Sequence, residues 1–283
     1  MSRVAWITGA GGLIGNYAVG VAPLAAPGWK VIGLSRNTLD LTDFPAVAAA
    51  LDRDRPSLIL HCAALSRSPA CEADSALARL QNVEVTRRLC SLARDLPLLF
   101  FSTDLVFDGR EGNYSEEGVP HPLSVYAETK AAAERVVLEN PRHFVLRTSL
   151  NGGVSPTGDR GFNEQMRSGW RRGHPMKLFT DEFRSPIPAE FTARAAWEIA
   201  LRGSPGIYHV AGRERLSRWQ IGELLAARCP ELNPQIQPGS LKEYQGAPRP
   251  PDTTLDCSKA QRILSFPLPG LAEWLGSNPS APF

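Results

Sequence analysis

Short, continuously apolar runs recur through the first half of the chain, and a segment of helical character follows most of them. Apolar runs without alternation are typical of strands buried on both faces of a parallel sheet. The runs lie at residues 4–8, 30–35, 57–61, 97–103 and 143–148. The helical segments between them include residues 16–21, 46–51 and a long stretch over 70–95 with one break. This repetition predicts an α/β fold with a doubly wound parallel sheet over residues 1–150.

The pattern loosens after residue 150. A Gly/Pro/Ser/Thr loop, a proline-broken extended stretch and a Pro-rich arm stand at residues 152–161, 181–188 and 247–251. Among them we predict a strand at 206–210 and helices at 191–201, 217–228 and 258–264. A capping box from Ser217 to Gln220 opens the second of these helices, and the third is the last helix that we predict in the chain. We expect residues 151–283 to form a smaller C-terminal α/β lobe that shapes a substrate pocket. The boundary at residue 150 is approximate, because the chain can pass back and forth between the two lobes.

A glycine-rich segment joins the first predicted strand to the first predicted helix. Its glycines permit a tight turn and a close approach of a ligand to the backbone, and the N–H groups at the helix start would then face an anion. A plain glycine-rich turn is the alternative, but the place between a strand and a helix favours a pyrophosphate. The predicted cofactor contacts here are Gly9, Gly11, Gly12, Leu13, Ile14 and Gly15.

The end of the second predicted strand bears on the choice of dinucleotide. NAD-binding sheets place an acidic residue about 20 residues past the glycines, where it holds the ribose 2′-hydroxyl. Here the strand ends in Ser35-Arg36, and an arginine suits the 2′-phosphate of NADP. We therefore favour NADP(H) over NAD(H), with a loop cation of no cofactor role as the alternative. Asp40 and Leu41 join the predicted cofactor contacts, ahead of Thr42 as the predicted N-cap of the next helix.

Small residues follow the third predicted strand. Cys62, Ala63 and Ala64 would let a cofactor lie close against the edge of the sheet. Tight packing alone would explain the same residues, so both interpretations stay open while these three are counted in the predicted cofactor site.

Tyr126 and Lys130 form the pattern most suggestive of chemistry. Residues four apart on a helix stand on one face, about 5–6 Å apart at Cβ, so both side chains point the same way if a helix starts near Tyr126. An ammonium near a phenol favours the phenolate and lowers a pKa that is ordinarily about 10. Such a pair can act as a general acid or base. A chance pair on a solvated helix is the alternative.

Two hydroxyls and a carboxylate close the fourth predicted strand. Ser102, Thr103 and Asp104 stand where open α/β sheets place their ligands. About two dozen turn-rich residues then precede Tyr126, and a loop of that length inside a compact fold is usually functional.

Composition and charge narrow the class of protein. The formal net charge is +2, and no run of Lys and Arg marks a nucleic-acid surface. The five cysteines are scattered without a Cys-x-x-Cys pair and the five histidines are dispersed, so we expect a reducing compartment, no disulfide frame and no metal site. We find no signal peptide and no 18-residue apolar stretch, and expect a cytoplasmic protein without membrane contact. A homodimer is compatible with these features.

The order of these features resembles the extended short-chain dehydrogenase/reductases, which have a Rossmann-type fold, and within them the dTDP-4-dehydrorhamnose reductase family. Residues 102–109, Ser-Thr-Asp-Leu-Val-Phe-Asp-Gly, are similar to that family's Ser-Thr-Asp-Tyr-Val-Phe-Asp-Gly stretch. Residues 122–134 are similar to its Pro-Leu-Asn-x-Tyr-Gly-x-Thr-Lys-x-x-Gly-Glu helix. Residues 181–186, Arg249-Pro250 and Leu255-Asp256 match later stretches less strictly, so the similarity covers nearly the whole chain.

The resemblance implies a role for each site residue. Tyr126 would donate a proton to a ketone oxygen while a hydride arrives from the nicotinamide. Lys130 would lower the Tyr126 pKa and hold the nicotinamide ribose, Thr103 would hydrogen-bond the same oxygen, and Asp104 would orient the sugar or the loop. The implied function is NADPH-dependent reduction of a nucleotide-activated 4-keto sugar, with the hydride chemistry supplied by the cofactor.

Three positions depart from the family's pattern. The Tyr after Thr-Asp is Leu105 here, and because the related 4,6-dehydratases carry a Glu at that place, Leu105 argues against dehydration. The aromatic residue that lines the family's sugar pocket is Leu150, which we assign to the substrate site together with Arg249. Leu150 and Arg67 leave open another nucleotide sugar, or a different carbonyl compound, as the ligand.

Two further functions remain open. The family also contains the regulatory beta subunit of methionine adenosyltransferase, which resembles this chain in keeping the Tyr and the Lys and would bind NADP and a partner without essential turnover. An epimerase or dehydrogenase acting on a nucleotide sugar would need tightly held NAD, which Arg36 disfavours.

Overall fold

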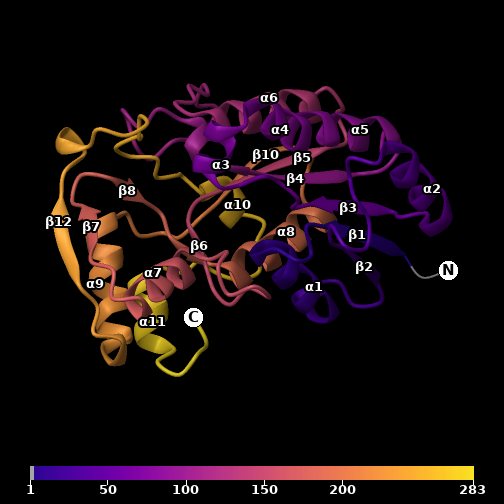
Figure 1. The fold of residues 1–283 in the computed structure, drawn as a ribbon. Helices are drawn as coiled ribbons and strands as arrows, with labels where there is room; N and C mark the ends of the chain where they lie inside the picture. The colour runs from indigo at the N-terminus through magenta and orange to yellow at the C-terminus, as the bar shows by residue number, and fades with distance from the viewer. Residues whose placement is uncertain (1–2) are drawn as a thin grey trace.

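The computed structural model describes residues 3–283, and its largest element is a parallel sheet (Figure 1). Within these residues six strands pair in the order β10-β5-β4-β3-β1-β2, which confirms the doubly wound α/β fold. They are β1 (Val4–Thr8), β2 (Lys30–Leu34), β3 (Leu58–His61), β4 (Leu98–Thr103), β5 (Phe144–Thr148) and β10 (Gly206–Val210). The strand order reverses between β1 and β3, and open α/β sheets bind ligands at such a point.

Helices cover both faces of the sheet (Figure 1). On one face α1 (Leu13–Ala25) packs against α8 (Ala189–Arg202), where the buried Trp197 indole N–H donates to the Ala18 carbonyl oxygen at 2.8 Å. The other face carries α2 (Phe44–Asp54), α4 (Ser75–Arg79), α5 (Val85–Leu92) and α6 (Val125–Leu138). Every residue of β3 and β4 is buried as a result, which is why these strands are continuously apolar in sequence.

The helix predicted over 70–95 is broken at Asp74, between α3 (Ser68–Ala73) and α4, and it contains a π-helical segment further on. This segment, η1 (Leu80–Glu84), joins α4 to α5. The buried Asn82 within it binds the loop after β3 through both amide atoms: its Nδ2 donates to the Leu65 carbonyl oxygen at 3.1 Å, and its Oδ1 accepts the Leu65 N–H at 2.8 Å. Single π-helical turns are frequent at functional sites, and this one fixes the loop beside the strand ends.

The C-terminal lobe has its own apolar core. Helices α7 (Phe162–Arg171), α9 (Arg218–Arg228) and α11 (Leu271–Ser277) contribute to it, and its Ile221 and Leu271 are fully buried. Short strand pairs complete the lobe: β7 (Met176–Phe179) with β12 (Ile236–Gly239), β8 (Phe183–Arg184) with β11 (Leu216–Ser217), and β6 (Asn151–Gly152) with β9 (Ile187–Pro188). The remaining helical turns are η2 (Asp104–Val106), η3 (Pro230–Leu232), η4 (Leu241–Glu243) and α10 (Ser258–Gln261).

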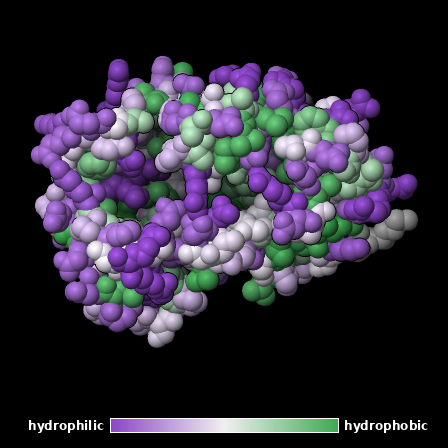
Figure 2. Space-filling model, viewed as in Figure 1, coloured by the Kyte–Doolittle hydropathy of each residue, from purple (hydrophilic) through white to green (hydrophobic). Residues whose placement is uncertain are grey.

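The chain interleaves between the two lobes. Strand β10 and helix α8 follow residue 150 in sequence, yet they complete the large sheet and one of its faces. The predicted capping box is confirmed, since Ser217 Oγ accepts the Gln220 N–H at 3.1 Å while Gln220 Oε1 accepts the Ser217 N–H at 2.8 Å. The two lobes meet beyond the carboxyl ends of the strands, and Figure 2 shows the molecule hollowed between them, with hydrophilic side chains around the hollow.

Two local predictions were wrong. The N-cap of α2 is Asp43, whose carboxylate accepts the Ala46 N–H at 3.0 Å, because the Thr42 hydroxyl turns back to donate to Asp40 Oδ1 at 2.7 Å. The helix predicted over 258–264 ends at Gln261 and is not the last, since α11 follows it. No helix in residues 3–283 combines the length and apolar character needed to cross a membrane.

Candidate active site

The glycine-rich loop between β1 and α1 has a backbone that only glycine can adopt. Gly9 has a φ of +69°, and a Cβ there would lie 2.7 Å from the Ala63 backbone nitrogen. A Cβ at Gly15 would lie 2.3 Å from the Gly9 carbonyl oxygen. No side chain caps the start of α1, so its first N–H groups are left for an anion. A tight loop leading to an uncapped helix start fits the pyrophosphate of a dinucleotide.

Gly9→Ala should therefore disrupt the loop. The left-handed backbone at residue 9 costs a non-glycine residue about 1–3 kcal/mol, and the new methyl group would also press on the loop after β3. We expect lower stability in urea denaturation and loss of NADPH binding in a fluorescence titration. Gly20→Ala is the control, because Gly20 is exposed on α1 with nothing within 4 Å of its Cβ position, and it should bind NADPH normally. NADPH binding of wild-type strength by Gly9→Ala would contradict this assignment.

The residues after β2 differ in their availability to a cofactor. Arg36 is exposed and donates only to Gln81 Oε1, at 3.2 Å, and no carboxylate pairs with it among residues 3–283. Asp40 accepts the Thr42 N–H and hydroxyl, and these hydrogen bonds, the N–H first, hold the pKa of its carboxyl below the ordinary value. Leu41 packs on the core beneath α2. Arg36 is thus the residue of the three that is placed to meet a phosphate.

The loop after β3 closes against the glycine-rich loop. Cys62 and Ala63 are half-buried and Ala64 is exposed, and the Ala63 N–H donates to Thr8 Oγ1 at 3.2 Å. Thr8 Oγ1 also lies 2.7 Å from the Nδ1 atom of His61. Burial lowers the pKa of His61 to about 3, so this ring is neutral and serves to fix the strand ends. Cys62 and Ala63 therefore lie directly against Gly9 of the glycine-rich loop.

Tyr126 lies at the start of α6, beside the end of β4. The Ser124 hydroxyl caps this helix by accepting the Ala127 N–H at 3.3 Å. Burial raises the pKa of Tyr126, the nearby Asp104 carboxylate raises it further, and the Thr103 hydroxyl offsets part of the rise. The predicted lowering of this pKa is not found, so the phenol is protonated at neutral pH, as a proton donor must be.

Lys130 is turned into the protein. Its Nζ donates to the Phe101 carbonyl oxygen at 2.6 Å and lies 3.8 Å from the centre of the Phe100 ring. Burial lowers the pKa of Lys130 to about 7, against the opposing effects of Glu134 and Cys62. Within residues 3–283 no hydrogen bond joins Lys130 to Tyr126. The prediction that Lys130 lowers the Tyr126 pKa was wrong for this structure because the ammonium points to the β4 backbone instead.

Asp104 is a structural anchor, which agrees with its expected role in orienting the loop and not with a contact to a sugar. It is fully buried, and Arg184 donates to both carboxylate oxygens, from Nε at 2.7 Å and from Nη2 at 2.5 Å. The hydroxyls of Ser149, Thr253 and Thr103 donate to it at 2.6, 3.1 and 3.2 Å. A carboxylate with this many protein donors has no lone pair left for a ligand. It joins the end of β4 to the C-terminal lobe.

The other predicted substrate residues lie in the C-terminal lobe. Leu150 is half-buried and packs against the core of that lobe. Arg249 forms a bidentate pair with Glu182, donating from Nε at 2.7 Å and from Nη2 at 2.9 Å. Contacts of these two residues with a substrate stay predictions.

Two arginines of this region were missed in the sequence. Arg184 lies within the stretch 181–186 that resembles the family, and Arg218 lies inside the predicted capping box. Either could have been noticed as a cation next to a recognised motif. Local spacing, however, does not bring Arg184 near Tyr126, which the fold does.

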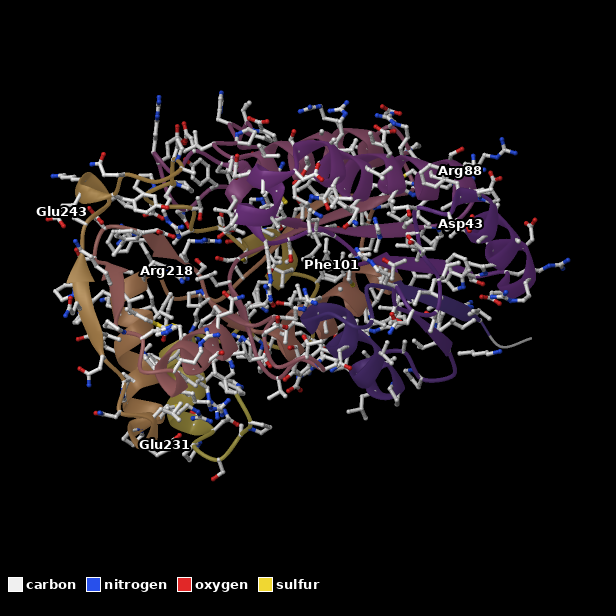
Figure 3. The ribbon with its side chains drawn as sticks, in the orientation of Figure 1. Asp43, Arg88, Phe101, Arg218, Glu231 and Glu243 are labelled. Carbon is white, nitrogen blue, oxygen red and sulfur yellow. The ribbon has the colours of Figure 1, made fainter. Side chains whose placement is uncertain are left out.

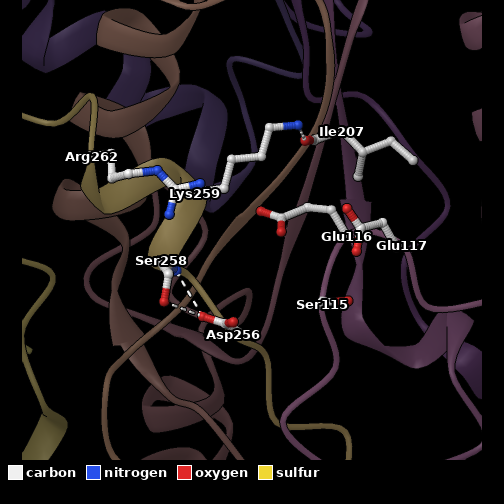
Figure 4. A pocket seen from close by; sticks show the side chains of 8 residues that line it. All are labelled: Ser115, Glu116, Glu117, Ile207, Asp256, Ser258, Lys259 and Arg262. Atoms are coloured by element: carbon white, nitrogen blue, oxygen red, sulfur yellow. Dashed lines mark hydrogen bonds between the residues drawn. The ribbon is translucent and has the colours of Figure 1, made fainter.

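Other features of the surface lie away from the strand ends. A hollow of about 570 Å³ borders the edge strand β10 and is lined by charges of both signs (Figure 4). There Lys259 Nζ donates to the Ile207 carbonyl oxygen at 2.6 Å, and Glu116 accepts the His209 N–H at 3.0 Å. These side chains occupy backbone groups that an edge strand would otherwise expose to another chain. Within residues 3–283, no cluster of His, Cys, Asp and Glu could hold a metal ion, and all five cysteine thiols are free.

The fold and the site together define an extended short-chain dehydrogenase/reductase. A glycine-rich loop follows β1, Ser102-Thr103 closes β4, and α6 carries Tyr126 and Lys130. The family model described as RmlD substrate binding domain matches residues 3–277, and the chain belongs to that family.

Known proteins of two kinds are similar to the chain. It is 30% identical to methionine adenosyltransferase 2 subunit beta of Xenopus laevis, over 93% of this chain and 83% of that protein. It is 29% identical to dTDP-4-dehydrorhamnose reductase of Aggregatibacter actinomycetemcomitans, over 92% of each. The crystal structure of dTDP-4-dehydrorhamnose reductase from Bacillus anthracis in complex with NADP covers 98% of both chains with a TM-score of 0.87 and 23% identity, a likeness of fold.

Proposed function

We propose that the protein reduces a nucleotide-activated 4-keto sugar with NADPH. The observation that carries this proposal is the place of the Tyr126 phenol beside the Thr103 hydroxyl, at the sheet end where the glycine-rich loop leaves an anion site. The reductase of Aggregatibacter actinomycetemcomitans, similar over nearly its whole length, supports the substrate class. Turnover with a panel of nucleotide 4-keto sugars and NADPH tests it.

The residues divide the work between binding and proton transfer. The α1 start would hold the pyrophosphate of NADPH and Arg36 its 2′-phosphate, and the cofactor would supply the hydride. Thr103, whose hydroxyl would have to turn away from Asp104 Oδ1, would orient the ketone oxygen, and Tyr126 would give that oxygen its proton. Lys130 would have to leave the Phe101 carbonyl oxygen to reach a ribose hydroxyl, and binding of the cofactor offers it that partner.

Arg36→Ala should weaken the preference for NADPH over NADH by about tenfold or more, because hydrogen bonds to a charged phosphate are among the strong ones. The ratio of kcat/KM for the two cofactors measures it. Arg88→Ala removes a charge from an exposed place on α5 and should leave that ratio unchanged. An unchanged ratio in Arg36→Ala would show that another residue selects the cofactor.

A regulatory role is the second candidate, favoured by the 30% identity to methionine adenosyltransferase 2 subunit beta. Such a protein would bind NADP and a partner enzyme without needing turnover. Co-elution with a methionine adenosyltransferase, unaffected by Tyr126→Phe, would support it. Rapid keto-sugar turnover without such co-elution would favour the reductase.

A further inference from the structure

One loop of the C-terminal lobe reaches two elements of the N-terminal lobe. We call residues 153–161, which join β6 to α7, the crossing loop. Near its start the Val154 N–H donates to the Tyr17 hydroxyl on α1 at 3.1 Å. Near its end the Asp159 carboxylate accepts a hydrogen bond from the guanidinium of Arg67, which lies in the segment after β3. The crossing loop therefore contacts the chain that follows β1 and the chain that follows β3.

These two contacts flank the place where the dinucleotide is expected. The strand order of the large sheet reverses between β1 and β3, and open α/β sheets bind their ligands at that point, beyond the carboxyl ends of the strands. Gly9 and the uncapped start of α1 lie on the β1 side of it, while Cys62 and Ala63 lie on the β3 side. A loop that belongs to the lobe beyond the strand ends, and is held at both Tyr17 and Arg67, therefore crosses the mouth of this site.

The crossing loop has a firm base in its own lobe. Near one end, the buried Glu164 carboxylate on α7 accepts the N–H and the hydroxyl of Ser155, both at 2.7 Å. Near the other end, the same carboxylate accepts the N–H groups of Arg160 and Gly161 at 2.9 and 2.8 Å. Both ends of the loop are thus tied to α7, so opening the loop requires only that its contacts with the other lobe break.

The bridge between Arg67 and Asp159 is suited to a reversible closure. The two side chains are 53% and 43% exposed, and exposed ion pairs add little to stability. A hydrogen bond from the Thr157 hydroxyl is the main cause that lowers the pKa of the Asp159 carboxyl, and nearby guanidiniums lower it further, so the bridge is charged at neutral pH. The buried pair of Asp104 and Arg184 joins the lobes elsewhere, so this bridge can open without separating them.

We propose that the crossing loop is the outer wall of the dinucleotide site and that the bridge between Arg67 and Asp159 keeps this wall closed, so that the bridge must open each time NADP(H) enters or leaves. The proposal rests on the cofactor binding of the proposed function, and it adds to that binding a gate supplied by the C-terminal lobe. Such a gate slows entry and release alike, because both need the same bridge to open. It therefore leaves the affinity for the cofactor unchanged.

Stopped-flow measurement of NADPH binding and release tests the proposal. Association is followed by NADPH fluorescence, and dissociation by displacement with excess NADP+. Asp159→Asn keeps the size of the side chain and removes its charge, so it should raise both rate constants by about two- to fivefold and leave Kd unchanged. Arg67→Gln should do the same. The double variant should be no faster than either single variant, because all three lack the same bridge.

Glu243→Gln is the control, because it breaks another exposed pair of the same lobe. Glu243 pairs with Lys177 at 2.7 Å, and Figure 3 shows it at the outer end of the C-terminal lobe, away from Phe101. NADPH should bind to this variant and leave it at the wild-type rates. All of these variants replace exposed side chains, so their melting temperatures should stay close to that of the wild type.

The rate constants also show how the proposal would fail. Unchanged rates in both Asp159→Asn and Arg67→Gln would overturn it. Faster release with an equally weaker Kd would overturn it too, since the bridge would then act only on the bound state and would not be a gate. A wild-type protein that binds no NADPH would contradict the proposed function as well. Normal NADPH binding and keto-sugar turnover, with rates that neither variant changes, would contradict this proposal alone.

Discussion

Tyr126→Phe should lower kcat for keto-sugar reduction by about a hundred- to ten-thousand-fold, the range expected for loss of a positioned acid. The substitution removes one hydroxyl from a half-buried ring beside Thr103 and leaves the glycine-rich loop untouched. NADPH should therefore bind with nearly wild-type affinity. Stopped-flow reduction and a separate NADPH titration measure the two effects.

A second tyrosine provides the control. Tyr208 is buried on β10, and its hydroxyl donates to the Ser204 carbonyl oxygen at 2.8 Å, away from the strand ends. Tyr208→Phe should keep wild-type turnover even if it loses some stability. If Tyr126→Phe turned over as fast as Tyr208→Phe, the proton would have to come from another group.

Asp104→Asn should cost roughly 3–5 kcal/mol of stability, as is typical when one partner of a buried ion pair is removed. Arg184 would then be buried beside a neutral amide, with the Glu182 carboxylate at 3.9 Å as its remaining negative neighbour. The amide keeps the size of the carboxylate, so packing is preserved. Urea denaturation of the cofactor-free protein measures the loss.

The matched control for this loss is Asp95→Asn. Asp95 pairs with Arg94 at 3.5 Å, but both side chains are more than 80% exposed, and exposed pairs add little to stability. Its midpoint in urea should stay close to that of the wild type. A midpoint for Asp104→Asn as high as that of Asp95→Asn would mean that Asp104 does not anchor the lobes.

The sheet could be predicted because its strands are encoded locally. Residues 98–103 are buried on both faces of the sheet. Their sequence therefore lacks the alternation of apolar and polar residues that is typical of a strand with one exposed face. Gly9 and Gly15 likewise marked their turn, since no other residue fits there. The return of β10 to this sheet could not be predicted, because strand order depends on contacts between segments far apart in sequence.

The site was harder to predict for the same reason. Helical spacing placed Tyr126 and Lys130 on one helix, but the direction of the Lys130 ammonium depends on the Phe101 carbonyl oxygen of another element. Asp104 stood in a motif typical of a ligand site, and only the position of Arg184, 80 residues further along, makes it an anchor. Arg218 is likewise 36 residues from Glu182 in sequence, and only the fold shows that the two are neighbours.

Transfer of deuterium tests the central claim most directly. NADPH carrying deuterium at the nicotinamide C4 position would be incubated with the enzyme and a nucleotide 4-keto sugar, and the product would be examined by mass spectrometry. A hydride mechanism predicts one deuterium on the former carbonyl carbon of each product molecule formed, with one NADPH consumed. The account would be contradicted by a reduced sugar that contains no deuterium whichever face of the nicotinamide carries the label. NADPH that is bound but never consumed would contradict it as well.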